Sequence, residues 1–274
     1  MRGRSGIVLC GGRSSRMGRP KAWLPWRERP MLAHVVDTLR RVVDDVVVVS
    51  APDLALPPLP ARVVCDPEPG LGPLAGIAEG LSHVGSDLAF VTGTDAPFLS
   101  PEFAEALFAF GAAAAPLVEG RVQTLAAVYP RSALTHARVL LARGRRRPLD
   151  LLEAVAYRKV QPHELPGTES LRGFNTPTEY LEAVREVEGD ATARLEFAGR
   201  ARRLAGCCAV EVPVGTLGEV LDRAPSGLAL RSGEGVAPEY RVTLGSGDPV
   251  DDAWIPVGPG ERVVVRDALA EEDP

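Results

Sequence analysis

The sequence has few of the residues that build zinc centres, disulfide frameworks or membrane spans. Its four histidines are not spaced in a way that suggests a metal-binding cluster. Its four cysteines, Cys10, Cys65, Cys207 and Cys208, form no C-x-x-C pair. No apolar stretch is long enough to cross a bilayer, and the apolar run before residue 10 is too short for a secretory signal. We therefore expect a cytoplasmic protein with no zinc, no disulfide and no membrane contact.

The chain also lacks a strong charge of either sign. It has 31 Lys and Arg against 36 Asp and Glu, a net charge of −5, so nucleic acid is not an obvious partner. The basic residues that stand out are local, at residues 13–21 and 143–147. A length of 274 residues, 45% of them hydrophobic, is enough for two domains with cores of their own.

A glycine-rich basic stretch follows the first apolar run. Residues 9–21 read Leu-Cys-Gly-Gly-Arg-Ser-Ser-Arg-Met-Gly-Arg-Pro-Lys. The glycines let the backbone turn tightly and approach a ligand closely, and Arg13, Arg16, Arg19 and Lys21 add positive charge. The spacing differs from the Walker loop and from G-x-G-x-x-G. We interpret the stretch as a phosphate cradle rather than as an ordinary strand-to-helix turn that happens to be basic.

Strand and helix patterns alternate after this loop. Continuous apolar runs predict buried strands at residues 5–10, 46–49, 62–65, 88–92 and 121–128. Helical periodicity predicts helices at residues 30–43, 77–83, 101–110, 132–141 and 177–187. The alternation favours an α/β, doubly wound, Rossmann-like domain. Its ligands should lie beyond the carboxyl ends of the strands, where the glycine loop, Asp66 and Asp95 fall.

Asp95 stands at the end of a predicted buried strand, and Pro97 stops further strand pairing. A carboxylate fixed there is well placed to hold a hard divalent ion against triphosphate oxygens. The alternative is a helix cap for residues 101–110, but Ser100 already occupies the capping position. We predict that Asp95 is a metal ligand.

The pattern L-x-G-G-x-S-x-R-M-G-x-x-K resembles the signature loop of nucleotidyltransferases with a glycosyltransferase-A-like fold, most closely the molybdenum cofactor guanylyltransferases. The resemblance implies that a phosphate of molybdopterin attacks the α-phosphorus of GTP and expels pyrophosphate. It implies Mg²⁺ on Asp95 and catalysis by Lys21, Arg16 and Asp95. Nucleotide binding is then expected from Leu9, Cys10, Gly11, Gly12, Ser14, Lys21, Asp66, Gly72, Pro73, Gly76 and Asp95.

Two of these features bear on the base. Residues 72–77, Gly-Pro-Leu-Ala-Gly-Ile, are similar to the guanylyltransferase loop that surrounds the nucleoside together with the preceding aspartate. The Asp66 carboxylate can accept hydrogen bonds from N1 and N2 of guanine, although a turn with a capping aspartate is the alternative. Gly11-Gly12 matches the guanine-using branch rather than the cytidine-using branch, which resembles L-A-A-G there.

Substrate-phosphate contacts are expected from Arg145, Arg146 and Asn175. A solvated basic turn that ends a helix is the default interpretation of residues 142–147, and the alternative is that some of these arginines bind phosphate through their forked guanidinium groups. Gly173-Phe174-Asn175-Thr176-Pro177 resembles the family's N-x-N-T-P element, with Gly173 in place of the first asparagine. A backbone group or water could substitute for that side chain. The alternative for Asn175 is a turn residue, with Thr176 capping the next helix.

The polar stretch Glu188-Gly189-Asp190 predicts a linker, which divides the chain into domains 1–189 and 190–274. The second domain is expected to be a small α+β unit of the ubiquitin-like β-grasp kind, with strands at 193–197, 209–212, 240–244 and 262–265 and a helix at 216–223. It resembles the sulfur-carrier subunit of molybdopterin synthase through residues 197–206, 212–221 and 258–263.

That carrier ends in Gly-Gly, where this sequence has Glu271 and Glu272. Charged side chains should not thread a channel shaped for bare backbone, so we expect no sulfur transfer. We favour a carrier-like domain that docks cofactor-synthesis or molybdoenzyme partners, or one that has no separate role. Two rival functions stay open: a related transferase that uses CTP or another phosphorylated acceptor, and a non-catalytic protein that senses GTP and docks a partner.

Overall fold

The computed structural model describes residues 3–11, 16–67, 70–225, 227–245 and 247–268. It divides into two compact units. The first contains Met1–Arg13 and Pro30–Gly173, and the second contains Ser14–Arg29 and Phe174–Pro274. The segment after the first strand therefore belongs to the same compact unit as the C-terminal part of the chain.

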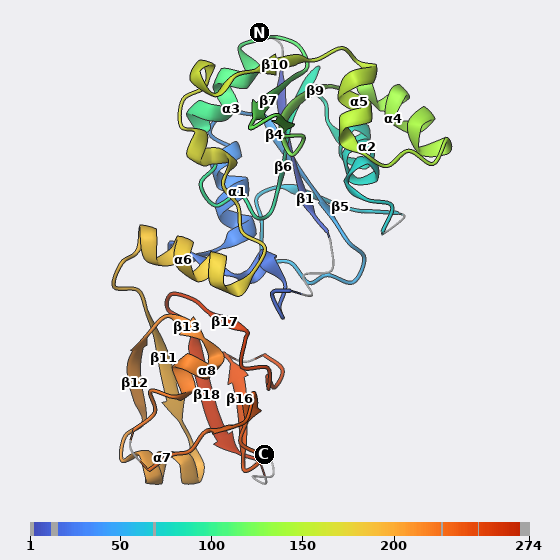
Figure 1. The fold of residues 1–274 in the computed structure, drawn as a ribbon. Helices are drawn as coiled ribbons and strands as arrows, with labels where there is room; N and C mark the ends of the chain where they lie inside the picture. The colour runs from blue at the N-terminus through green and yellow to red at the C-terminus, as the bar shows by residue number, and fades with distance from the viewer. Residues whose placement is uncertain (1–2, 12–15, 68–69, 226, 246, 269–274) are drawn as a thin grey trace. The chain divides into compact units, whose positions relative to one another are not determined.

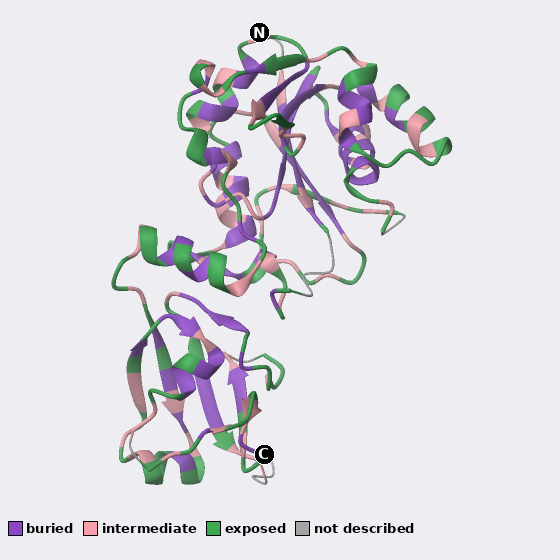
Figure 2. Cartoon of the chain, viewed as in Figure 1, coloured by how far each residue is buried: buried purple, intermediate pink, exposed green. Residues whose placement is uncertain are grey.

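Four parallel strands form one half of the sheet in the first unit (Figure 1). They lie in the order β6 (Leu88–Gly93), β1 (Arg4–Cys10), β4 (Asp45–Ser50) and β5 (Arg62–Cys65). Figure 2 shows β1, β4 and β6 buried along most of their length, as their continuous apolar runs predict, whereas β5 is an exposed edge. The parallel half of the predicted sheet is confirmed, and its strands end at one edge.

The other half of the sheet is mixed, which corrects the wholly parallel, regularly alternating arrangement that the sequence favours. β9 (Ala126–Pro130) pairs antiparallel with both β6 and β7 (Ala114–Val118), and β10 (Arg158–Val160) pairs parallel with β7. The prediction of a single strand at residues 121–128 is wrong. A turn interrupts it between β8 (Arg121–Val122), which forms a hairpin with β7, and β9.

Helices cover both faces of this sheet. They are α1 (Met31–Leu39), α2 (Pro73–His83), α3 (Pro101–Phe108), α4 (Ala133–Ala142) and α5 (Pro148–Ala154). In Figure 1, α1 and α3 lie on one face and α2, α4 and α5 on the other. The helix predicted at 30–43 ends earlier, at Leu39, and α2 begins four residues earlier than predicted because Pro73 suits the first helical position. Helix α5 was not predicted from the sequence. Two short 3-10 helices follow, η2 (Pro162–Glu164) and η3 (Thr168–Leu171).

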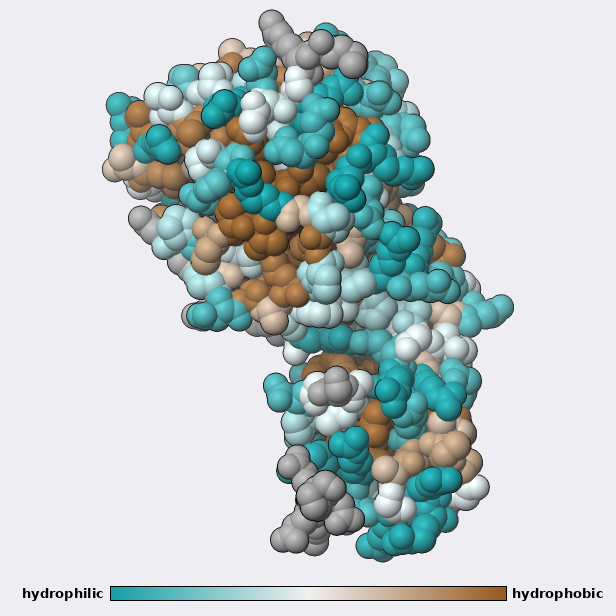
Figure 3. Space-filling model, turned by 180° about the vertical axis from the view of Figure 1, so that it is seen from behind, coloured by the Kyte–Doolittle hydropathy of each residue, from teal (hydrophilic) through white to brown (hydrophobic). Residues whose placement is uncertain are grey.

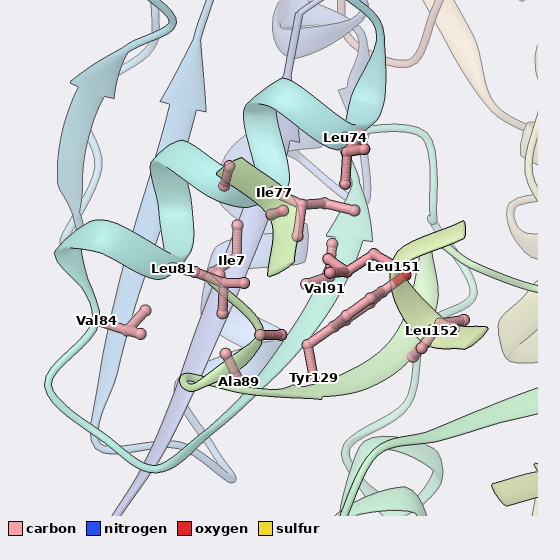
Figure 4. Packing of buried hydrophobic residues seen from close by; sticks show 14 of the residues in the cluster. Ile7, Leu74, Ile77, Leu81, Val84, Ala89, Val91, Tyr129, Leu151 and Leu152 are labelled. Atoms are coloured by element: carbon pink, nitrogen blue, oxygen red, sulfur yellow. The ribbon is translucent and has the colours of Figure 1, made fainter. Parts of the chain in front are cut away.

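Helix α2 packs onto the central strands. Ile7 of β1 and Val91 of β6 meet Ile77 and Leu81 of α2 in a buried cluster that Leu151 of α5 closes (Figure 4). Gly80 allows this close approach, since a Cβ there would lie 2.5 Å from Cγ2 of Ile7. The packing fixes α2, and with it the segment that leads into it, against the strand that precedes the glycine loop.

The second unit contains a four-stranded sheet in the order β12 (Ala209–Pro213), β11 (Thr192–Phe197), β18 (Arg262–Asp267) and β16 (Tyr240–Leu244). The central strands β11 and β18 are parallel, and the other two pairs are antiparallel. These four strands confirm the sequence prediction. The predicted helix is the shorter α8 (Leu217–Leu221), for which Thr216 and Glu219 form a capping box.

Smaller elements complete the second unit. They include α6 (Pro177–Val187), which confirms its prediction, the unpredicted α7 (Gly199–Ala205), and η1 (Lys21–Trp23). Short strand pairs are β13 (Gly215–Thr216) with β17 (Pro256–Val257) and β14 (Arg231–Ser232) with β15 (Gly235–Val236). β2 (Pro25–Trp26) and β3 (Arg29–Pro30) also pair. Buried side chains of β11, β18 and α8 form a separate core.

The surface mixes polar and apolar residues. Figure 3 shows brown, hydrophobic areas bordered by teal residues on the first unit. Such mixing is ordinary, because apolar atoms supply more than half of a folded protein's surface. Over the described residues, no helix combines the length and the apolar character that a bilayer crossing requires.

Candidate nucleotide site

Backbone hydrogen bonds tie the strand ends of the first unit together. The amide of Asp66 donates to the carbonyl of Ser50 at 2.7 Å. The amide and the hydroxyl of Thr94 both donate to the carbonyl of Leu9, at 3.2 and 3.1 Å. Asp66, Asp95 and the start of the glycine loop therefore lie at the same sheet edge, as predicted. Gly11 is exposed there, whereas the predicted ligands Gly12 and Ser14 lie outside the described residues.

Asp95 is half-buried two residues after the end of β6, and neighbouring backbone lies close to it on two sides. A Cβ on Gly93 would lie 2.6 Å from Oδ1 of Asp95, and a Cβ on Gly173 would lie 2.6 Å from its carbonyl oxygen. Ser100 caps α3 by accepting a hydrogen bond from the amide of Phe103, as predicted. The position of Asp95 is therefore specified by its close neighbours.

The segment before Gly173 holds the rest of the Asp95 loop. The guanidinium of Arg172 lies 4.3 Å from the ring centre of Phe98, and Oγ of Ser170 accepts a hydrogen bond from the amide of Ser100 at 3.1 Å. Glycine at 173 lets this segment approach so closely. The contact gives a physical reason for the difference from the family's asparagine, since a side chain at this position meets the backbone of Asp95.

Pro73 and Gly76 lie in the first turn of α2 rather than in a loop, which corrects the expected local structure. Only Gly72 precedes the helix, with φ of 84°. A Cβ on Gly76 would lie 3.1 Å from Cδ2 of Leu9, so Gly76 packs α2 against the strand that leads into the glycine loop. Their nucleotide contacts stay predictions.

A pocket of about 410 Å³ adjoins Asp66. Side chains of α2 and α4 line it, among them Ala75, Ala78, Arg138 and Leu141. The half-buried carboxylate of Asp66 therefore borders a hollow lined by both apolar and charged side chains, Glu79 and Arg138 among the latter.

The arginine-rich turn after α4 ends that helix, as one of the two interpretations of residues 142–147 held. The amides of Gly144 and Arg145 donate to the carbonyls of Leu141 and Leu140, each at 2.9 Å, which forms a Schellman cap. The Arg145 guanidinium donates twice to Asp150, at 3.0 and 2.6 Å. These bonds hold the pKa of the Asp150 carboxyl below its usual range.

Arg145 is thus engaged in closing the turn between α4 and α5, and its contact with substrate phosphate stays a prediction. Arg146 is exposed, and its carbonyl lies 3.6 Å from where a Cβ on Gly72 would be. The basic turn therefore runs beside the start of α2.

Lys21 and Asn175, which lie 154 residues apart in the sequence, meet in the second unit. Nζ of Lys21 donates to the carbonyl of Phe174 at 2.7 Å and approaches Oδ1 of Asn175 at 3.4 Å. Thr176 caps α6 in a capping box with Glu179, as the alternative interpretation held. Arg16 is exposed in the turn that precedes Lys21.

The position of Arg19 corrects the prediction that all four basic residues of the stretch surround a phosphate. Its guanidinium forms an ion pair with Glu261, at 2.7 and 2.8 Å, near the end of the described chain. The sequence analysis missed this partner, because no local pattern connects residues so far apart. Glu261 lies within residues 258–263, for which the sequence indicates only a resemblance to the sulfur carrier.

The acidic side chains fit a Mg²⁺ site whose ligands come partly from the protein and partly from the substrate phosphates and water. Among the described residues, no group of three or more His, Cys, Asp or Glu side chains is placed to hold a metal ion. Mg²⁺ commonly takes one or two carboxylates, with substrate phosphates and water as its other ligands. One half-buried carboxylate at a strand end, as at Asp95, matches that donor set.

Residues 6–160 match the family model described as the MobA-like NTP transferase domain, which spans more than half of the chain. The chain belongs to this family. A probable molybdenum cofactor guanylyltransferase of Bacillus mycoides (strain KBAB4) is 30% identical over an alignment of 196 residues, which covers 68% of this chain and 98% of the relative. One from Mycobacterium bovis (strain BCG / Pasteur 1173P2) is 36% identical over an alignment of 185 residues, which covers 63% of this chain and 92% of the relative.

The fold of the MobA-like domain is also shared with known structures. Molybdopterin-guanine dinucleotide biosynthesis protein A from Archaeoglobus fulgidus aligns with a TM-score of 0.58 at 23% identity, over 68% of this chain and 99% of that chain. About a third of the present chain lies outside each of these alignments.

Proposed function

We propose that the chain transfers GMP from GTP to the terminal phosphate of molybdopterin or of the molybdenum cofactor, which gives the guanine dinucleotide form and pyrophosphate. One observation carries the proposal: Asp66 and Asp95 are fixed at the ends of parallel strands beside the glycine loop, in a MobA-like domain. Relatives named probable molybdenum cofactor guanylyltransferase align over nearly their whole length, which supports this choice of substrates.

The transfer needs no covalent enzyme intermediate. An acceptor phosphate oxygen attacks the α-phosphorus of GTP, the bond from the α-phosphorus to the bridging oxygen breaks, and pyrophosphate leaves. Asp95 would hold Mg²⁺, which neutralises charge that develops on the phosphates. Lys21, anchored on the carbonyl of Phe174, and the exposed Arg16 act as electrostatic partners of the triphosphate.

Base selection is assigned to Asp66. Its carboxylate accepts from the N1 and N2 hydrogens of guanine, whereas cytosine and adenine do not offer this pair of donors. The acceptor phosphate is assigned to the exposed Arg146 beside Gly72, together with Asn175. Arg145 supports that turn through Asp150.

We also propose that residues 190–274 form a β-grasp domain that docks cofactor-synthesis or molybdoenzyme partners in the cytoplasm. Its support is the strand order β12-β11-β18-β16 with parallel central strands, and a helix after the first hairpin. The residues that replace the carrier's Gly-Gly, Glu271 and Glu272, lie outside the described part of the chain.

The decisive experiment measures pyrophosphate release by the full chain with molybdopterin and Mg²⁺, with GTP, CTP and ATP offered separately. Release with GTP alone supports the reaction and the base preference. Release with CTP would identify a cytidylyltransferase. GTP binding without release would favour another phosphorylated acceptor or a sensing protein.

A further inference from the structure

The segment that carries Arg16 and Lys21 is packed tightly within the second unit. Within this segment, Met17, Ala22 and Leu24 are buried. A Cβ on Gly18, where φ is 67°, would lie 2.9 Å from Cγ1 of Ile255. The segment is therefore packed against Ile255, the residue before β17, rather than lying on the surface as an independent loop.

The strongest contact is the pair between Arg19 and Glu261. Nη1 of Arg19 lies 2.8 Å from Oε2 and Nη2 lies 2.7 Å from Oε1, a two-pronged geometry that fixes both side chains. Their side chains are only 15% and 14% exposed, so solvent screens the pair little. Nη1 also donates to the carbonyl of Pro256 at 3.2 Å, and Oε2 accepts from the amide of Gly258 at 2.8 Å.

A second contact joins the turn after β17 to the far end of the segment. Gly258 lies against Tyr180 of α6 and Pro25, where a Cβ would collide with the Tyr180 hydroxyl. That hydroxyl donates to the carbonyl of Pro25 at 2.6 Å. The rings of Tyr180 and Phe174 lie 5.2 Å apart, and the carbonyl of Phe174 receives the hydrogen bond from Lys21. Residues 256–261, which are β17 and the turn after it, thus hold the segment on both sides of Lys21.

We propose that Glu261 is a positioning residue: through Arg19 it fixes the conformation of the segment that carries Arg16 and Lys21, the proposed electrostatic partners of the triphosphate. The C-terminal domain is then a working part of the transferase and not only a docking module. Loss of the Glu261 charge leaves the guanidinium nearly buried without its counter-ion, so the segment must shift. This inference rests on the proposed GTP site.

The test uses the full-length chain with Glu261→Gln, which keeps the shape of the side chain and removes its charge. We expect the KM for GTP and the Kd for GTP to rise about tenfold to 100-fold, because displacements of about 1 Å have effects of that size. The amides of residues 16–26 should also exchange hydrogen faster than in the wild type.

Glu196→Gln is the matched control. Glu196 pairs with Arg262 at 2.7 Å and with Arg194 at 3.0 Å in the same sheet, and its side chain is 20% exposed. This variant should match the wild type in GTP affinity and in exchange of residues 16–26. Arg19→Ala combined with Glu261→Ala should be no worse than either single change, because both remove the same link.

The outcomes separate the two proposals. If the wild type neither binds GTP nor releases pyrophosphate, the proposed function and this inference both fail. If the wild type is active and Glu261→Gln behaves like Glu196→Gln in affinity and exchange, only the positioning role is overturned. Additive effects of the two alanine changes would also overturn it.

Discussion

Alanine at position 173 should impair Mg²⁺-dependent turnover much more than it impairs folding. The new Cβ would lie 2.6 Å from the carbonyl oxygen of Asp95, about 0.8 Å short of ordinary contact. The opposing atom belongs to the backbone, so no side-chain rotation relieves the clash and the Asp95 peptide must move. A displacement approaching 1 Å at a catalytic group lowers turnover on the order of 100-fold. Overpacking also costs about 1–3 kcal/mol of stability.

The assay is pyrophosphate release as a function of Mg²⁺ concentration, together with the thermal midpoint. Gly85→Ala is the matched control, because a Cβ there meets nothing within 4 Å. It should turn over like the wild type and be neutral or slightly more stable, since alanine reduces the entropy of the unfolded chain. Gly173→Asn, which restores the family's residue, should be at least as damaging as Gly173→Ala.

Equal turnover and equal Mg²⁺ dependence of Gly173→Ala and Gly85→Ala would refute this prediction. That result would mean that the position of Asp95 does not depend on the close approach of Gly173, or that Asp95 does not hold the ion. A loss of stability with unchanged turnover would assign Gly173 to packing alone.

Three further predictions address single groups. Lys21→Ala should leave the circular dichroism spectrum unchanged and lower the rate of pyrophosphate release about 100-fold to 1,000-fold; normal turnover would remove Lys21 from the mechanism. Asp95→Asn should raise the Mg²⁺ concentration needed for half-maximal turnover, and EDTA should abolish turnover in the wild type; unchanged metal dependence would refute its role as ligand. Asp150→Asn should lower the thermal midpoint at pH 7. Because the bond from Arg145 lowers the folded pKa of Asp150, its stabilisation is present above the unfolded value of about 4 and is lost as the pH falls. The gap between variant and wild type should therefore close in acid, and a gap independent of pH would contradict the assignment.

The parallel half of the first sheet could be predicted because its strands are continuous β-branched or apolar runs buried on both faces, as at residues 46–49. The antiparallel half could not. β7 reads Ala-Ala-Pro-Leu-Val, which has little strand propensity, and tertiary pairing with β9 decides its structure. α5 has seven residues and follows an arginine run, so it offers too short a period to recognise.

The site shows the same division between local and distant information. Asp66 and Asp95 could be placed together because the carboxyl ends of parallel strands share one edge. Lys21 and Asn175 could be grouped only through the family resemblance, and the structure brings them to 3.4 Å. Neither the pair between Arg19 and Glu261 nor the contact between Gly173 and Asp95 has a local sequence signal, since both depend on packing across many residues.

The pair between Arg19 and Glu261 changes how the basic loop is understood. Charge alone suggests that every cation in residues 13–21 faces phosphate, yet Arg19 is neutralised by a carboxylate and only 15% exposed. A guanidinium held by Glu261 and by the carbonyl of Pro256 adds little positive potential for a ligand, but it restrains the backbone on either side. Among the described cations of this stretch, phosphate attraction would then be left to Arg16 and Lys21, while Arg19 would supply the rigidity that an electrostatic site needs if its charges are to be in place before the reaction.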